Sequence, residues 1–287
     1  MIFSKLTIIS LLFISNCFGQ YFYGLNFGID QNNCPPLQTY VNHFNAIKKY
    51  TNRVRSYSLS VCNQGALALE AAHSTGMNIY LGMWVDRPDT FQNELQALKN
   101  LLANHDLKNV EAIIVGSEVL YRKDTPPNDL ANYIKQIKSI VGPHGVSVTT
   151  ADVFYTFTPE VIDAVDFVMM NAFPYWEGVE INDAAKTLFQ HYDSVVSVAK
   201  GKKVKIAETG WPGSGGNFGP SVASPENQAK YLKDVLCLAK KRGVDVIYFS
   251  AYDEPYRGNG VEGSFGIMNS GLSLKSTIKI QDLTQTC

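Results

Sequence analysis

Three apolar runs of the chain end on carboxylates. One run ends at Glu118, a second ends at Glu208, and a third is followed by Asp253 and Glu254. A charge at the end of a buried strand is costly unless it is paired or used in chemistry. Two facing carboxylates suit glycosidic cleavage, in which one protonates the leaving oxygen and the other attacks the anomeric carbon. We therefore expect Glu118 and Glu208 to be catalytic; the alternative for either is a structural ion pair.

Aromatic residues accompany these carboxylates. Trp211 lies in the turn Glu208-Thr-Gly-Trp-Pro212, and Tyr175-Trp176-Glu177 follows another apolar run. The C–H face of a pyranose is apolar, so an aromatic ring can stack on it and exclude water. We predict that Trp211 forms part of the floor of a sugar site, with core packing as the alternative, and that 175–177 is an acceptor platform. Trp84 is predicted to pack in the barrel.

The elements that must position these residues repeat as an apolar run followed by an amphipathic stretch. The runs are 23–29, 54–58, 79–85, 112–119, 146–153, 167–173, 204–208 and 246–252. The intervening patterns of helical spacing are 37–49, 66–74, 90–102, 128–140, 159–164, 184–199 and 225–241. This alternation predicts parallel strands and a single α/β domain, a (β/α)8 TIM barrel, with an open doubly wound sheet as the alternative. Function is then expected at the carboxyl ends of the strands.

The first 19 residues have the pattern of a secretory signal peptide. Lys5 precedes an apolar run over 6–14, and small residues precede Gln20. This run is shorter than the ~20 residues that a membrane-spanning helix needs, so a membrane anchor is the weaker alternative. We predict a signal peptide over 1–19 and a catalytic barrel over 20–287. The mature protein is expected to be secreted, extracellular or in the cell wall, with no membrane partner.

Cysteines and charge narrow the chemistry further. The four cysteines after the predicted signal favour two disulfides. Cys34 and Cys62 follow strands that are adjacent in a barrel, so we predict Cys34–Cys62 and, by elimination, Cys237–Cys287. No zinc-type spacing occurs, and no metal or cofactor is expected. A net charge of −1 gives no electrostatic reason to expect nucleic acid.

Several motifs together resemble a known family. They are Gly24-Leu-Asn-Phe-Gly28, Val54-Arg-Ser-Tyr57, Val115-Gly-Ser-Glu118, Asn171-Ala-Phe-Pro-Tyr175, Glu208-Thr-Gly-Trp-Pro212, Asp253-Glu254 and Ser264-Phe-Gly-Ile-Met-Asn269. The chain is similar to family 17 of the glycoside hydrolases, β-1,3-glucanases and glucanosyltransferases, and its compact length resembles the fungal wall-remodelling branch. The resemblance implies a barrel, a retaining mechanism, Glu118 as acid/base and Glu208 as nucleophile. Ser117 departs from the pattern, because most relatives have an Asn there that holds the sugar 2-hydroxyl.

Residues for substrate binding follow from position and from this resemblance. Tyr57 is expected to donate its hydroxyl to Glu208, whereas Arg55 belongs either to the site or to an ion pair at the barrel bottom. Glu254 and Arg257 match an acidic–basic pair of the family, with Glu262 in the same network, and Asn26 is a further candidate for sugar hydroxyls. The predicted binding set is Tyr57, Ser117, Tyr121, Asn171, Tyr175, Trp176, Glu177, Trp211, Glu254 and Arg257.

The predicted function is a retaining glycosidase that cleaves β-1,3-glucan through a glycosyl-enzyme on Glu208. Transfer to another glucan, as in a β-1,3-glucanosyltransferase, is favoured over transfer to water. The alternatives are a purely hydrolytic endo-β-1,3-glucanase, a different linkage such as 1,3-1,4, and a non-catalytic glucan-binding wall protein. The expected partners are a laminarin-like donor and an oligosaccharide acceptor, and a monomer is expected.

Overall fold

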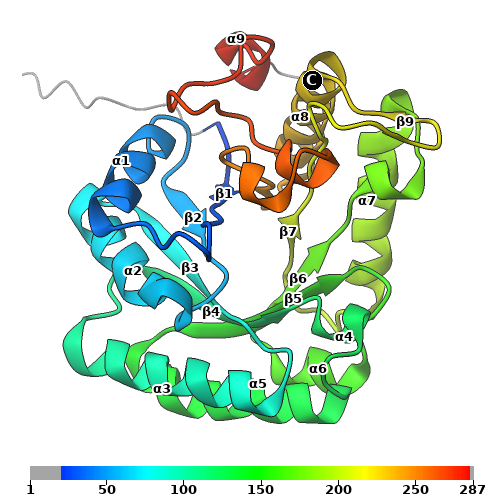
Figure 1. Ribbon diagram of the computed structural model, residues 1–287. Helices are drawn as coiled ribbons and strands as arrows, with labels where there is room; N and C mark the ends of the chain where they lie inside the picture. Colours follow the sequence, from blue (N-terminus) through cyan, green and yellow to red (C-terminus); the bar gives the residue numbers. More distant parts are fainter. Residues whose placement is uncertain (1–20, 285–287) are drawn as a thin grey trace, which may run out of the picture.

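The computed structural model describes residues 21–284 and contains a barrel of eight parallel strands (Figure 1). The hydrogen-bonded order is β10-β1-β2-β3-β4-β5-β6-β7. The strands are Gly24–Asn26 (β1), Arg53–Arg55 (β2), Asn78–Met83 (β3), Val110–Ser117 (β4), Ser147–Val153 (β5), Val168–Asn171 (β6), Val204–Glu208 (β7) and Ile247–Tyr248 (β10). The parallel bridge between Ile206 and Val246 joins β7 to the approach of β10 and closes the ring. The predicted (β/α)8 barrel is confirmed.

Amphipathic helices surround the strands. They are Leu37–Ile47 (α1), Gln64–Thr75 (α2), Pro88–Asn104 (α3), Pro127–Val141 (α5), Pro159–Ala164 (α6), Ile181–Val198 (α7) and Pro225–Arg242 (α8). In α5, Leu130, Ile134, Ile137 and Val141 recur at helical spacing and are fully or almost fully buried, and a proline at the first helical position starts the helix. Each helix therefore covers the outer face of the barrel with one apolar stripe.

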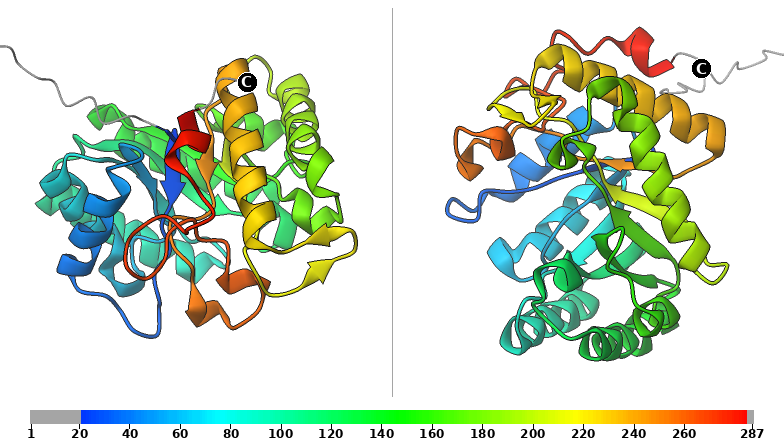
Figure 2. Two further views of the ribbon diagram at one scale, coloured as in Figure 1. Left: turned by 90° about the horizontal axis from the view of Figure 1, so that it is seen from above. Right: turned by 90° about the vertical axis from the view of Figure 1, so that its right-hand side faces the viewer.

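Short elements that the sequence pattern did not predict occur in the loops. A four-residue helix, Val119–Arg122 (α4), follows β4, and a hairpin of Asn217–Phe218 (β8) and Ser221–Val222 (β9) follows β7. The segment Ile280–Thr284 (α9) packs against α8 near the end of the described chain. In Figure 2 the loops 27–36, 213–224 and 253–266 project from the same end of the barrel, where the strands end. These loops build the walls of the site.

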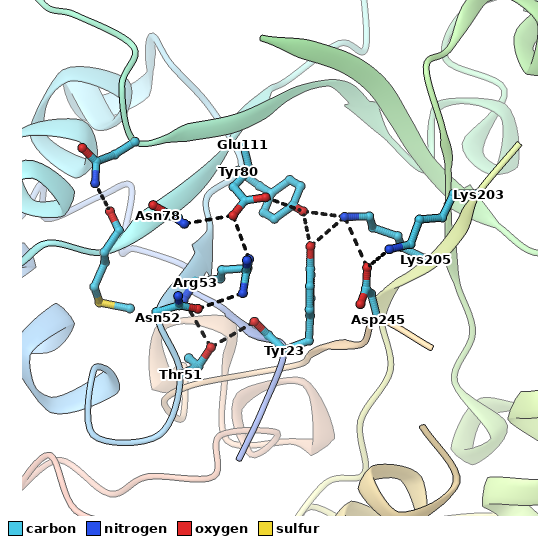
Figure 3. A network of polar contacts seen from close by, with 12 residues as sticks. Tyr23, Thr51, Asn52, Arg53, Asn78, Tyr80, Glu111, Lys203, Lys205 and Asp245 are labelled. Atoms are coloured by element: carbon cyan, nitrogen blue, oxygen red, sulfur yellow. Dashed lines mark hydrogen bonds and ion pairs between the residues drawn. The ribbon is translucent and has the colours of Figure 1, made fainter. Parts of the chain in front are cut away.

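The barrel interior has an apolar middle and polar ends. Tyr80, Ala112, Ala151, Met169 and Ala207 belong to one small cluster that fills the middle. At the end where the strands begin, side chains from different strands form the polar network of Figure 3. The interior is therefore a packed core whose two polar ends differ in their chemistry.

Lys205 is the centre of this network at the strand starts. Its Nζ donates to the hydroxyls of Tyr23 (2.7 Å) and Tyr80 (2.8 Å), and it pairs with Asp245 at 3.4 Å (Figure 3). Arg53 pairs with Glu111 at 2.8 Å on the same level. These contacts satisfy charges that would otherwise be costly inside a barrel.

The disulfide Cys34–Cys62 is present and confirms that prediction. It joins the loop after β1 to the loop after β2. The predicted Cys237–Cys287 pairing involves Cys287, which lies outside the described residues, as does the predicted signal peptide over 1–19. Within residues 21–284, no helix combines the length and apolar character needed to cross a membrane.

Candidate active site

Glu208 is the last residue of β7 and is buried at the carboxyl end of the barrel. Its Oε1 accepts from the Arg55 guanidinium at 2.5 Å and from the Ser117 hydroxyl at 3.3 Å. Arg55 ends β2 and is 1% exposed, so the ion pair is almost completely removed from water. Of the two roles considered for Arg55, the structure places it in the site, and Arg53 forms the ion pair at the barrel bottom. The guanidinium fixes the position of the Glu208 carboxyl group at the mouth of the barrel.

Ser117 and Asn26 complete the setting of Arg55. The second guanidinium nitrogen donates to Ser117 Oγ at 3.0 Å, and the first also reaches Asn26 Oδ1 at 3.2 Å. Asn26 in turn donates to the carbonyl of Ala207 at 3.0 Å. Four strands, β1, β2, β4 and β7, are therefore linked at one point around the Glu208 carboxylate.

Glu118 follows β4 in a left-handed conformation with φ 58°, after Gly116 at φ 80°. Only glycine adopts such angles without strain, and a Cβ at Gly116 would also overlap Val119. The turn is held from β5, because the Asp152 carboxylate accepts from the backbone N–H groups of Leu120 (2.8 Å) and Tyr121 (3.2 Å). This geometry lifts Glu118 out of the strand and anchors the helix α4 that follows it.

The environment of Glu118 differs from that of Glu208. Burial, together with the negative charge of Glu208, raises the pKa of Glu118 to about 7. Asn171 at the end of β6 donates to Glu118 Oε1 at 3.1 Å, and Arg122 lies 3.8 Å from its other oxygen. Near neutral pH this carboxyl group can hold a proton and deliver it, which is the property of a general acid.

Tyr57 lines the cavity, but its hydroxyl does not bond to Glu208 as predicted. It donates to Asn26 Oδ1 at 3.0 Å, and its ring lies against the Arg55 guanidinium at 4.8 Å. Burial and the charge of Glu208 raise the pKa of Tyr57 well above its ordinary value. The phenol therefore stays protonated and supports Arg55, which itself holds Glu208.

Glu254 and Arg257 form the predicted ion pair, yet their positions differ. Glu254 is almost completely buried behind the cavity wall, whereas Arg257 lines the cavity. A Cβ on Gly28 would overlap the Glu254 carboxylate, so glycine permits this close approach. Glu254 thus positions Arg257, and the prediction that Glu254 itself contacts substrate does not match its burial. Glu262 is an exposed residue of the cavity wall.

The prediction that Trp211 forms the floor of a sugar site is wrong. Its ring is 0% exposed, packs edge-on against Tyr175 and donates its Nε1–H to the carbonyl of Val222 at 2.9 Å. Tyr175 is also fully buried, and its hydroxyl donates to the Gly216 carbonyl at 3.0 Å. Both rings form the core under the β8–β9 hairpin, so neither can stack on a sugar.

A cavity of about 1000 Å³ is lined by both glutamates. The structure brings the following predicted residues to its wall: Tyr57, Ser117, Glu118, Tyr121, Asn171, Trp176, Glu177, Glu208 and Arg257. Tyr121 is half exposed and Trp176 remains accessible, as ligand-stacking rings must be. Glu177 accepts from or pairs with His191 at 2.8 Å beside the same wall.

Several cavity residues were not identified from the sequence. Tyr155, Phe218 and Trp84 line the wall, and Trp84 stacks under the Arg122 guanidinium at 4.9 Å instead of packing inside the barrel. Asp152 is also a carboxylate near the end of a strand, β5, so the criterion that selected Glu118 and Glu208 would have selected it too. Phe218 lies in a glycine-rich hairpin whose strands are too short to show the alternation of apolar and polar residues that predicts a strand.

Two carboxyl groups, Glu208 paired with a guanidinium and Glu118 with a pKa raised by burial, can divide the nucleophile and acid roles of glycosidic cleavage between them. Among residues 21–284, no cluster of three or more His, Cys, Asp or Glu is placed to hold a metal ion. The fold and the site therefore define a barrel of the glycosidase class.

Comparison with known proteins resolves the class further. Residues 24–266 match the BtgE/BtgC glycoside hydrolase domain. A glucan 1,3-beta-glucosidase of Schizosaccharomyces pombe is 33% identical over 261 residues, which are 84% of this chain and 81% of that protein. The crystal structure of a glycoside hydrolase family 17 beta-1,3-glucanosyltransferase from Rhizomucor miehei is 61% identical, with a TM-score of 0.89 over 91% of this chain and 98% of that one.

The chain belongs to the BtgE/BtgC glycoside hydrolase family. The resemblance to family 17 that its motifs predicted is thereby confirmed. A second structure of the Rhizomucor miehei protein, an active-site mutant in complex with laminaritriose, is 60% identical with the same TM-score.

Proposed function

We propose that this protein is a retaining β-1,3-glucan glycosidase that transfers the cleaved glycosyl unit to a second glucan chain. Support comes from the two glutamates and from the similarity to a β-1,3-glucanosyltransferase and to glucan 1,3-beta-glucosidases. The observation that carries the proposal is the pairing of Glu208 with buried Arg55 beside a Glu118 whose pKa lies near 7.

In the first half of the proposed reaction, Glu118 protonates the leaving oxygen while the Glu208 carboxylate bonds to the anomeric carbon. The glycosidic bond breaks, and its electron pair leaves with the shortened glucan as an alcohol. In the second half, Glu118, now ionised, removes the proton of an incoming hydroxyl, which displaces Glu208. Ser117 precedes Glu118 in the chain and donates to Glu208. Asn171 donates to Glu118 and is the strand partner of Glu208. These links fit the short separation of the two carboxyl groups in retaining enzymes.

Transfer is proposed over hydrolysis because accessible aromatic rings lie on the Glu118 side of the cavity. Tyr121, Tyr155 and Trp176 follow β4, β5 and β6 and expose 50%, 64% and 38% of their surface. Rings on this side can bind an acceptor sugar where it meets the glycosyl-enzyme and displace water. A purely hydrolytic endo-β-1,3-glucanase is the second candidate, because the chain is also similar to a protein named glucan 1,3-beta-glucosidase.

Products formed from laminaritetraose, resolved by mass, separate these functions. Oligosaccharides longer than the substrate are expected, and Trp176→Ala should shift the products toward shorter ones by weakening the acceptor. Products that are all shorter than the substrate would favour hydrolysis. Absence of any product would contradict the enzymatic function.

The nucleophile is tested with Glu208→Gly and azide. Azide should occupy the space of the missing carboxylate and yield an α-glycosyl azide from an activated β-glucosyl donor. Glu118→Gly in azide should instead yield the β-azide, because the glycosyl-enzyme still forms. An α-azide from the Glu118 variant alone would reverse the two assignments.

We further propose that the protein is secreted as a monomer into the extracellular space or cell wall. The support is the N-terminal pattern over 1–19 and the disulfide Cys34–Cys62, because disulfides persist in oxidising compartments. The secreted protein should begin at or near Gln20 by mass spectrometry and elute with the mass of one chain. Retention of residues 1–19 in the secreted protein would contradict the predicted cleavage.

A further inference from the structure

A second hollow lies on the outer surface, between α2 and α3. Its volume is about 460 Å³, within the usual range of small-molecule sites. Five amide side chains line it: Asn63, Asn93, Gln96, Asn100 and Asn104. The four on α3 recur at helical spacing over eleven residues, or about 17 Å, and so form one continuous ladder along the groove.

The ladder is polar without being charged. Between Asn93 and Asn104, Lys99 is the one exposed charged residue of α3, whereas solvent-facing helix surfaces usually carry many charges. Gln96 donates to Asn100 Oδ1 at 3.0 Å, and Asn104 donates to the Asn100 carbonyl at 2.7 Å. Each amide carries two N–H donors and two acceptor lone pairs, so these bonds leave capacity for a ligand.

The floor of this amide groove is apolar. The partly exposed Ala66 and Ala97 present methyl groups to it, and the buried Leu59 and Leu101 lie directly beneath. An apolar floor between amide walls matches a pyranose, whose C–H face is apolar and whose edge carries hydroxyls that both donate and accept. Glu70 and His105 also line the groove, and they lie 3.8 Å from each other, so the lining holds no cluster of charges of one sign that would select an ionic ligand.

We propose that the amide groove is a second, non-catalytic binding site for a neutral β-glucan chain. This inference rests on the proposed function, because it assumes a polymeric glucan substrate. The partner is a segment of that polymer beyond the part that occupies the cavity over Glu118 and Glu208.

The two hollows share one wall. Ser58, Val61 and Gln64 line the catalytic cavity, whereas Leu59, Ser60 and Asn63 line the amide groove. A chain that extends past this loop on the β2 side would pass directly from one hollow to the other.

The shared loop is held rigidly. The buried Glu94 of α3 accepts from the backbone N–H of Leu59 at 2.7 Å and from the Ser60 hydroxyl at 2.7 Å. The disulfide Cys34–Cys62 ties the same loop to the loop after β1. These contacts fix the distance between the amide groove and the catalytic cavity. A polymer bound in the groove would therefore be held at high effective concentration near Glu118 and Glu208.

The test uses Asn100→Ala/Asn104→Ala, with Asn132→Ala/Gln136→Ala on the exposed face of α5 as a matched control of the same chemistry and spacing. In the Glu208→Gln background, each protein is run in native gels containing laminarin. The groove variant should lose about 3- to 10-fold in apparent affinity for laminarin, as removal of two hydrogen-bonding groups implies. Its affinity for laminaritriose should match that of the parent, and the control should change neither value.

With Glu208 intact, the groove variant should lose the same factor in kcat/KM on laminarin and none on laminaritetraose. Equal laminarin affinity in the groove variant, the control and the parent would overturn the proposal. It would also be overturned if dextran retarded the parent as strongly as laminarin does and the groove variant lost both effects equally. Failure of the proposed function is distinct, because it would appear as absent activity on laminaritetraose in the intact protein. Melting temperatures of all variants verify that the fold is kept.

Discussion

Glu118 and Glu208 are the same residue type in two environments that give them opposite properties. The Arg55 guanidinium contacts Glu208 directly, whereas Glu118 is buried near the negative charge of Glu208 and lies 3.8 Å from the nearer nitrogen of Arg122. The difference arises from neighbouring strands and not from the glutamates' own sequence context. It produces an acid and a nucleophile at the same pH.

The pH dependence of activity should report Glu118. Since the acid must be protonated and its pKa is about 7, kcat/KM on a glucan substrate should fall tenfold per pH unit above about 7. Glu118→Gln should lose ~10²–10⁴-fold on that substrate and lose this basic limb. Glu160→Gln, a surface change, should keep the wild-type profile. An unchanged basic limb in the residual activity of the Glu118 variant would assign it to another group.

Stability should respond to the same group with a defined sign. The folded pKa of Glu118 is raised above its ordinary value of 4.5, so its stabilising contribution is complete below pH 4.5 and lost as pH rises through about 7. Relative to the wild type, Glu118→Gln should therefore gain up to about 3 kcal/mol between pH 4 and pH 8, measured by urea unfolding. A difference in unfolding free energy that is constant with pH would contradict this.

At the residue scale, both glutamates and part of the cavity wall were predictable from the sequence, whereas the position of Trp211 and the partner of Tyr57 were predicted wrongly. A tryptophan beside a turn can face solvent or the core. The β8–β9 hairpin determines that Trp211 faces the core, because it covers the ring and the Val222 carbonyl accepts the indole N–H. Such long-range covering leaves no local pattern in the sequence. The Tyr57 hydroxyl differs for a similar reason, since Asn26 from another strand is its acceptor.

At the scale of elements, the periodic pattern gave bounds close to those of the structure. The predicted run 204–208 and helix 159–164 coincide with β7 and α6, whereas the last run, 246–252, contains just the two-residue β10. Short elements were missed because α4 and the β8–β9 hairpin are too brief to show a period. These same short elements carry Tyr121 and Phe218 to the cavity, so elements without a periodic pattern also contribute aromatic rings to its wall.

The anchoring of α4 can be tested through Asp152. Asp152→Ala removes the acceptor of the Leu120 and Tyr121 N–H groups, and kcat should fall about tenfold because Glu118 loses its fixed position. Asp152→Asn keeps a carbonyl oxygen and should recover most of the rate. KM for a short oligosaccharide should change less than kcat in both. A loss confined to the unfolding free energy would show that Asp152 has a structural role without a positioning one.

At the scale of the whole molecule, barrel closure depends on side chains as well as on the strand ladder. The bridge Ile206–Val246 joins β7 to the segment before β10, and Lys205 and Lys203 both pair with Asp245 beside it. The barrel itself was predictable because eight apolar runs alternate with helical patterns. The polar network that closes it was not, since its members are single residues on separate strands (Figure 3).

Separate replacement of Lys205 and Lys203 should distinguish the contribution of a buried lysine to the free energy of unfolding from that of an exposed one. Lys205→Met leaves the hydroxyls of Tyr23 and Tyr80 without their ammonium partner and should cost about 2–3 kcal/mol in unfolding free energy. Lys203→Met removes a side chain that is 60% exposed and should cost less than about 1 kcal/mol. Denaturant titration measures both values. Equal losses of unfolding free energy would show that closure of the barrel between β7 and β10 does not depend on the buried polar network.

The short strand β2 joins the two polar ends of the barrel through Arg53 and Arg55, which lie two residues apart and share the inner face. A slip of this strand by one residue would turn both guanidiniums outward into the apolar layer under the helices and place Val54 inside. Each arginine would then be a buried charge without its carboxylate, so mispaired forms of this strand are strongly disfavoured. The ion pairs Arg55–Glu208 and Arg53–Glu111 therefore favour the native register of β2 at both ends of the strand.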